Sequence, residues 1–173
     1  MLPRVSFSLA LAVLATVAAA CDPVAPPLSG DVADGAFEAR VSGDVQTDLN
    51  GSATFSVETE GGETVSSIAL VDAASEDDAA FLLIDGQAAA RTYTVGTTNT
   101  GVVLVLRDGD GGDVFAAESG SVTLTQADAD LVAGSFDVVA ASLTDAGERV
   151  QVYGSFSARP GVAPMGEAAL RAR

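Results

Sequence analysis

Apolar and polar residues alternate with a period of two along most of this chain from Gly35 onwards. Successive side chains of a β-strand point to opposite faces, so this pattern predicts strands with one buried and one solvated face. We expect strands at 37–45, 53–57, 67–71, 81–84, 92–95, 101–107, 121–125, 132–140 and 150–158. The last third is the most regular, and its apolar face carries Val132, Phe136, Val138, Val150, Val152 and Phe156.

Turn signals separate these segments. Asn50-Gly51 is a strong signal for a two-residue hairpin, and Gly61-Gly62 and Asp85-Gly86 mark further turns. Short strands joined by tight turns in chain order are typical of an antiparallel meander. The sequence therefore predicts an all-β fold, an antiparallel meander that forms a β-barrel or a β-sandwich of about 8–10 strands.

Three of the expected strands are apolar on both faces, at 68–71, 81–84 and 102–106. Such a strand needs a cover on its outer side, or it lines a cavity or a contact face. Coverage by a loop or by the C-terminal tail is the plainer interpretation. The functional one is a barrel mouth or patch that takes an apolar ligand or a partner protein.

The triplet Gly-Ser-Phe occurs at 134–136 and again at 154–156. A buried phenylalanine ring can lie over the bare backbone of a nearby glycine in a sheet. We therefore interpret both triplets as core structure and not as a binding motif.

The N-terminal segment has a different pattern. Met1 to Arg4 carry one positive charge, and Val5 to Ala20 follow without any charge. This is the layout of an export signal, and its uncharged run of roughly 16 residues is shorter than the ~20 that a membrane-spanning helix needs. We expect the segment to be removed before Cys21, the only cysteine of the chain.

The junction Val17-Ala18-Ala19-Ala20-Cys21 resembles the lipobox of bacterial lipoproteins, with Ala18 where leucine is usual. The resemblance implies that Cys21 is acylated and becomes the first residue of the mature chain. Several acyl chains on one residue give stable anchoring to a membrane. The alternative is cleavage by ordinary signal peptidase, which Ala18 and Ala20 also suit and which leaves a free thiol. Because the chain has no second cysteine that Cys21 could pair with, we favour lipidation.

Composition narrows the possible chemistry. The chain has 24 acidic and 8 basic residues, for a net charge of −16. This balance excludes nucleic acid as a partner, and anionic membrane surfaces would repel the chain. All the basic residues are arginine and there is no histidine, so imidazole bases, histidine metal ligands and lysine Schiff bases are absent. We expect no cofactor and no enzymatic activity; a carboxylate pair of the glycosidase type is the catalytic arrangement that remains.

Acidic residues cluster at three places along the chain. Asp108, Asp110 and Asp113 lie on a glycine-rich loop between the strand expected to end at Arg107 and one expected to begin near Val114, and a loop with several carboxylates can bind Ca²⁺. The spacing is not that of an EF-hand, and Asp-Gly is common turn chemistry, so an ordinary hairpin loop is the competing interpretation. The other clusters, which we expect to be solvated loops unless they gather at one rim, are Glu76-Asp77-Asp78 and Asp128 with Asp130.

The final third resembles a pattern of small, mostly uncharacterised bacterial lipoproteins. Their pattern is Gly-x-Val-x-Leu-Thr, then Gly-x-Phe, then a closing Val-x-Val-x-Gly-x-Phe. Here it corresponds to Gly120, Val122, Leu124, Thr125, Gly134, Phe136, Val150, Val152, Gly154 and Phe156. The resemblance implies an antiparallel β-barrel or β-sandwich and brings no known activity with it.

The chain therefore divides into a lipoprotein signal peptide (1–20), a lipidated Cys21 with a proline-rich tether (21–34), an acidic β-domain (35–160) and a flexible C-terminal tail (161–173). We expect its N-terminal lipid to anchor it in the bacterial cell envelope, at the outer membrane rather than the inner one. Asp22, however, resembles the inner-membrane retention signal of enteric lipoproteins. The expected role is non-enzymatic binding or structure. The alternatives are a calcium-stabilised adhesion or matrix module and a carboxylate-dependent polysaccharide hydrolase.

Overall fold

The structure, a computed structural model, describes residues 32–75, 77–96, 100–108 and 111–161, and the side chains of all of these except 106–108, 111 and 112. The described chain forms nine β-strands in the order β1 (Ala36–Gly43), β2 (Thr47–Glu60), β3 (Glu63–Asp72), β4 (Ala79–Asp85), β5 (Thr92–Thr94), β6 (Thr100–Asp108), β7 (Gly111–Ala127), β8 (Val132–Ser142) and β9 (Arg149–Pro160). In these ranges no helix has the length and apolar character of a membrane span.

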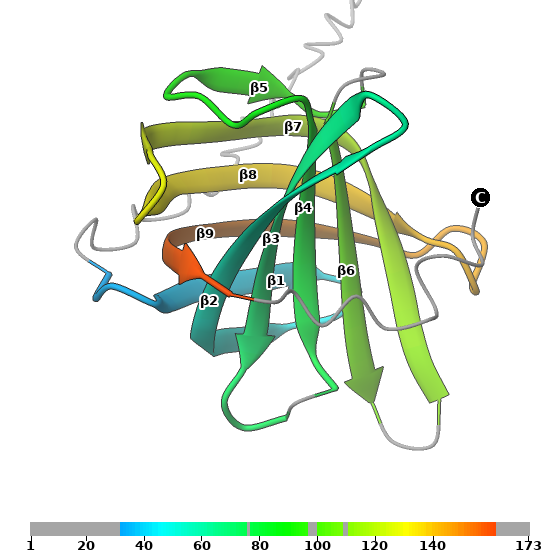
Figure 1. Cartoon of the computed structure of the whole chain (residues 1–173). Helices are drawn as coiled ribbons and strands as arrows, with labels where there is room; N and C mark the ends of the chain where they lie inside the picture. Colours follow the sequence, from blue (N-terminus) through cyan, green and yellow to red (C-terminus); the bar gives the residue numbers. More distant parts are fainter. Residues whose placement is uncertain (1–31, 76, 97–99, 109–110, 162–173) are drawn as a thin grey trace, which may run out of the picture.

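Eight of the strands close into an antiparallel barrel. Their order around it is β7-β6-β4-β3-β2-β1-β9-β8, and the pairing of β7 with β8 completes the circle. The remaining strand, β5, pairs with the second half of β7, whose first half pairs with β6. In Figure 1, β7, β8, β9 and β1 form the back wall, and β3, β4 and β6 cross in front of it. The predicted all-β antiparallel meander is confirmed, and of the two predicted forms the chain adopts the barrel.

The inward positions of these strands fill the barrel with side chains. The bulkiest fully buried residues come from all around the wall: Phe37, Val41, Ile68, Leu70, Leu82, Ile84, Leu104, Phe115, Val122, Val138, Val150 and Val152. An eight-stranded barrel has an interior just wide enough for its own side chains. The interior is therefore a core, and sites for other molecules are to be sought on the ends and the outer surface.

The predicted turn at Asn50-Gly51 is wrong. The chain reverses earlier, between Gly43 and Thr47, and Gly51 lies inside β2 between Phe37 of β1 and Asp72 of β3. A Cβ atom on Gly51 would collide with the carbonyl oxygen of Val71. The glycine thus allows two backbones to approach closely. In the sequence, a glycine with this role looks the same as a glycine in a turn.

The two Gly-Ser-Phe triplets face each other across β8 and β9. Phe136 pairs directly with Gly154, and Gly134 pairs directly with Phe156. The rings of the two phenylalanines lie 6.4 Å apart between centroids. A Cβ atom on Gly154 would lie 2.7 Å from Cζ of Phe136, so the ring occupies the space above the bare glycine of the opposite strand. The triplets are core structure, as expected. The phenylalanine of one triplet covers the glycine of the other triplet, on the neighbouring strand, and not the glycine of its own.

Asp72 is a buried carboxylate that ties three segments together. It is 5% exposed. One oxygen accepts the backbone N–H of Asn50 at 2.8 Å, and the other accepts the N–H groups of Ala74 and Ser75 at 2.9 and 3.0 Å. The Asp72 side chain thus accepts hydrogen bonds from backbone N–H groups at the start of the β3–β4 loop and in the neighbouring strand β2.

We expect Asp72→Ala to lower the free energy of unfolding by about 3 kcal/mol, because it leaves three backbone N–H groups without an acceptor. Urea denaturation measures the loss. The control Asp85→Ala removes an exposed carboxylate from the end of β4 and should change stability by less than about 0.5 kcal/mol. Equal effects of the two substitutions would contradict the role given to Asp72.

Candidate functional site

The two ends of the barrel carry different connections. Because neighbouring strands are antiparallel, the β2–β3, β4–β6 and β7–β8 connections lie at one end, where β1 also begins and β9 ends. We call this the tether end. The β1–β2, β3–β4, β6–β7 and β8–β9 connections lie at the other end, which we call the acidic end.

A groove of about 530 Å³ lies at the tether end. This volume is within the range of ligand-binding sites. Its walls come from β2, the start of β3, the connection after β4, the β7–β8 turn and the end of β9. The lining residues are Phe55, Ser56, Val57, Thr59, Thr64, Gln87, Ala88, Ala127, Asp128, Ala129, Val132, Pro160 and Gly161.

The groove exists because the β2–β3 hairpin projects beyond the barrel wall. β2 and β3 pair as far as Glu60 and Glu63, whereas the β3–β4 ladder stops at Ser66 and the β2–β9 ladder at Phe55. In Figure 1 this hairpin rises at the top, and the β7–β8 turn and the end of β9 lie together at the left. The groove is the space between the hairpin and that turn.

The groove has an apolar floor and an acidic rim. Phe55 is buried at its base, whereas Val57 is 48% exposed. On the opposite wall, the Asp128 carboxylate accepts hydrogen bonds from the Gln126 side chain at 2.7 Å and from two backbone N–H groups of its turn. These bonds, that from Gln126 first, lower the pKa of Asp128, so the rim keeps its negative charge in mild acid.

The expected tether joins the barrel beside this groove. The N–H of Gly35 donates to the carbonyl of Ser157. Asp34 accepts the Ser157 hydroxyl at 3.1 Å and pairs with Arg159 at 3.1 Å. Pro160, which directly follows Arg159, lines the groove. Any chain leading from a membrane anchor to Asp34 therefore arrives at the groove end of the barrel.

The doubly apolar strands have one face in the core and the other on the outer surface. Their outward residues form a patch on β3, β4, β6 and the start of β7, which we call the outer patch: Val71, Phe81, Leu83, Val103, Val105 and Val114. All six side chains are half-buried. Apolar patches on an outer sheet face mark contact surfaces. The contact-face and barrel-mouth interpretations stay predictions, and they concern the outer patch and the groove.

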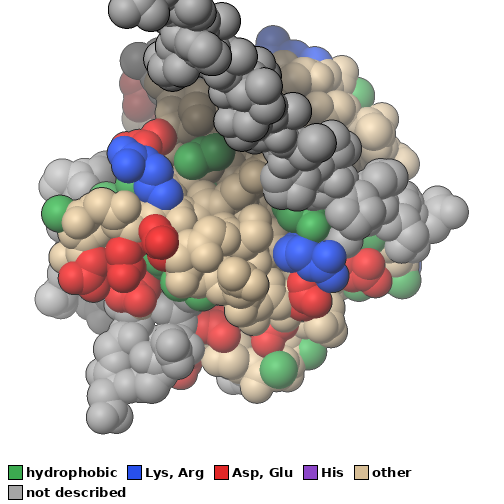
Figure 2. Space-filling model, turned by 180° about the vertical axis from the view of Figure 1, so that it is seen from behind, with side chains coloured by type: hydrophobic (Ala, Val, Ile, Leu, Met, Phe, Trp, Pro, Cys, Tyr) green, Lys and Arg blue, Asp and Glu red, His purple; other side chains and the backbone are tan. Residues whose placement is uncertain are grey.

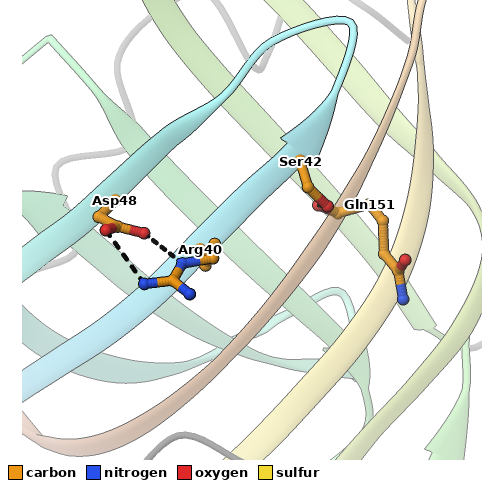
Figure 3. Close-up of polar contacts among 4 residues, drawn as sticks. All are labelled: Arg40, Ser42, Asp48 and Gln151. Atoms are coloured by element: carbon orange, nitrogen blue, oxygen red, sulfur yellow. Dashed lines mark hydrogen bonds and ion pairs between the residues drawn. The ribbon is translucent and has the colours of Figure 1, made fainter. Parts of the chain in front are cut away.

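The back wall is polar on its outer side. Figure 2 shows it from behind, with groups of acidic side chains, some of them beside basic ones, around a largely uncharged surface. Arg40 makes two bonds to Asp48, at 2.6 and 3.2 Å (Figure 3). These bonds raise the pKa of Arg40 and lower that of Asp48. Both side chains are largely exposed, so the pair adds little stability.

Four carboxylates come together at the acidic end. Asp44 follows β1, Asp113 lies near the start of β7, and Asp145 and Glu148 belong to the β8–β9 loop. Partial burial raises the pKa of Glu148, and repulsion from Asp145, Asp113 and Asp44 raises it further. The Asp113 carboxylate accepts a hydrogen bond from the Thr144 hydroxyl at 3.3 Å. The neighbouring carboxylates therefore disfavour the ionised form of Glu148.

We expect Glu148→Gln to raise the melting temperature at pH 7 and low salt. A carboxyl group whose pKa is raised by folding disfavours the folded state once the pH exceeds its ordinary value of 4.5. The gain should vanish below that pH and also in high salt, which screens the repulsion. Glu58→Gln, which removes the same charge at the other end, is the control. Thermal unfolding at two pH values and two salt concentrations measures both variants, and an equal gain from the control would contradict the local repulsion.

The predicted site residues separate in space. Cys21, Glu76 and the side chains of Asp108 and Asp110 lie outside the described residues, so lipidation and calcium binding stay predictions. Among the side chains that are described, no three acidic or cysteine residues are placed to hold a metal ion. Asp77 lies at the acidic end, whereas Asp128 and Asp130 lie at the tether end. The three acidic clusters therefore do not gather at a single rim.

The sequence reasoning missed the groove. The sequence feature that indicated it was the nine-residue gap between the strands expected at 53–57 and 67–71. The glycine pair at the centre of this gap needs only two of those residues for a turn. The alternating residues on either side of that pair belong to the projecting hairpin. A longer hairpin than its neighbours predicts an overhang at a barrel mouth.

The fold and the groove define a class: a filled, eight-stranded antiparallel barrel with an open groove at the end where the N-terminal chain enters. Comparison with known proteins adds nothing to this class. No protein-family model, no curated protein and no solved structure matches the chain.

Proposed function

We propose that this protein is a lipid-anchored module of the bacterial cell envelope, that Cys21 carries the lipid, and that the barrel binds a partner and performs no catalysis. The observation that carries the proposal is the shared location of the groove and the tether attachment. Through Asp34 and its bonds to Ser157 and Arg159, the anchor is joined to the barrel at the end that holds the groove.

The tether limits how far the groove lies from the membrane. The residues from Cys21 to Asp34 span at most about 45 Å when fully extended. The prolines among them favour an extended, semi-rigid chain. The net negative charge of the domain keeps its walls away from an anionic lipid surface. The groove thus faces the space between barrel and membrane, where it meets partners at or near the lipid surface.

A distance measurement tests this orientation. Val57 at the tether end and Leu143 at the acidic end are both exposed, at 48% and 63%, so each can be replaced by cysteine and labelled with a fluorophore. In lipidated protein on vesicles, we expect stronger energy transfer from the Val57→Cys label than from the Leu143→Cys label to an acceptor lipid. Equal or reversed transfer would contradict the proposed orientation. The Val57 position is informative only if the labelled variant keeps the melting temperature of the parent.

A further inference from the structure

Among the described residues, nothing pairs with the groove side of β2 beyond Phe55. On one side, β2 pairs with β3 along its whole second half, from Gly51 to Glu60. On the other side, it pairs with β1 up to Ser52 and with β9 at Thr54 and Phe55. In the described part of the chain, the last bond on that side is donated by the N–H of Gly161 to the carbonyl of Phe55 at 3.0 Å.

The direction of the backbone groups follows from the bonds that are made. Ala53 donates its N–H to the carbonyl of Gly35, and the carbonyl of Phe55 accepts the N–H of Gly161. The backbone N–H and C=O groups of the odd-numbered β2 residues therefore point away from β3. Asn50 accepts from Ala73 on the β3 side. Because backbone groups alternate along a strand, the N–H and C=O groups of Val57 and Thr59 point into the groove. An open edge with free donors and acceptors is the template for adding a strand.

The side chains at this edge select the kind of segment that fits. Phe55 and Val57 offer an apolar surface to every second residue of an added strand. The edge continues into Glu58, Glu60 and Glu63 of the hairpin, which are all exposed, and Asp128 stands on the opposite wall. Charge complementarity therefore favours a segment in which basic residues alternate with aliphatic ones.

We propose that the groove binds an extended basic and aliphatic segment of a partner protein, which adds a strand to the open edge of β2 through the backbone groups of Val57 and Thr59. This mode of peptide recognition takes affinity from main-chain hydrogen bonds and specificity from alternate side chains. The inference rests on the proposed binding function and names the chemistry of its partner.

The test uses the full mature chain and the synthetic peptide Arg-Val-Arg-Val-Arg-Val, with Glu-Val-Glu-Val-Glu-Val as the charge control. We expect the basic peptide to bind and to slow amide exchange at Val57 and Thr59, while the acidic peptide leaves exchange unchanged. Thr59→Pro removes the N–H at an odd position, so the β2–β3 ladder keeps its bonds. This variant should bind the basic peptide about tenfold more weakly.

Thr59→Val is the matched variant, because it also loses the 3.1 Å hydroxyl contact to Thr64 but keeps the N–H. It should bind within about twofold of the parent. Equal binding by Thr59→Pro and the parent would overturn strand addition. Strand addition by a partner would also be overturned if the peptide bound a chain truncated after Gly161 but not the full mature chain. The residues beyond Gly161 would then be the occupant of the edge. Neither result depends on the vesicle orientation, so a failure here is distinguishable from a failure of the proposed function.

Discussion

Gly154→Ala is expected to lower the free energy of unfolding by about 3 kcal/mol, although it adds a single methyl group. The new Cβ atom would lie 2.7 Å from the carbonyl oxygen of Glu38, 2.7 Å from the ring of Phe136 and 2.8 Å from Cβ of Ala39. All three atoms belong to neighbouring strands or to the packed core, so none can move without disturbing the barrel wall. Urea denaturation measures the loss.

Two further variants separate this clash from a general effect of replacing glycine. Gly101 in β6 has open space around its Cβ position and an ordinary φ, so Gly101→Ala should be neutral or stabilising by up to about 1 kcal/mol. Shortening the facing ring with Phe136→Leu should recover part of the loss in the Gly154→Ala background, because the two residues are in contact. Simple additivity of the two changes would show that the ring does not occupy the space above Gly154.

Cys21→Ser is expected to move the protein from the detergent-rich phase to the aqueous phase in a cloud-point partition. Several acyl chains on the cysteine hold a protein stably in a membrane, and serine offers no thiol for their attachment. The barrel has a polar back wall and a net negative charge, so the domain without lipid should remain in water. The partition of the two forms, expressed from the full-length gene in a bacterium, measures the change.

The double variant Cys21→Ser with Ser29→Cys is the control. It keeps one thiol in the same tether but moves it away from the cleavage junction, so it should partition into the aqueous phase like Cys21→Ser. A detergent-phase location for the single variant would show that the association with the membrane does not depend on the cysteine.

The period-two pattern predicted the class of fold correctly because it reports directly on burial. Val150, Val152 and Phe156 are buried as their alternation indicated, while the intervening Gln151 is exposed. The choice between barrel and sandwich depended on the pairing of β1 with β9, the first and the last strand of the described chain. No local pattern in the sequence encodes that pairing. The predicted position of the first hairpin was wrong because Gly51 allows close packing of two backbones and does not form a turn.

The candidate site was less predictable than the fold. The groove depends on the unequal lengths of adjacent ladders, so its walls come from residues as distant in sequence as Phe55, Ala88, Asp128 and Pro160. Each of these is unremarkable in its own stretch of sequence. The doubly apolar strands predicted where apolar side chains lie on the outside of the barrel, and the outer patch lies on these strands.

The mass of the mature N-terminal peptide tests the central claim most directly. Protein isolated from bacterial membranes and digested with a protease should yield a first peptide that begins at Cys21, is heavier than its sequence by the attached acyl groups, and has no thiol that reacts with iodoacetamide. A first peptide with the mass of the bare sequence and a reactive Cys21 thiol would contradict the account.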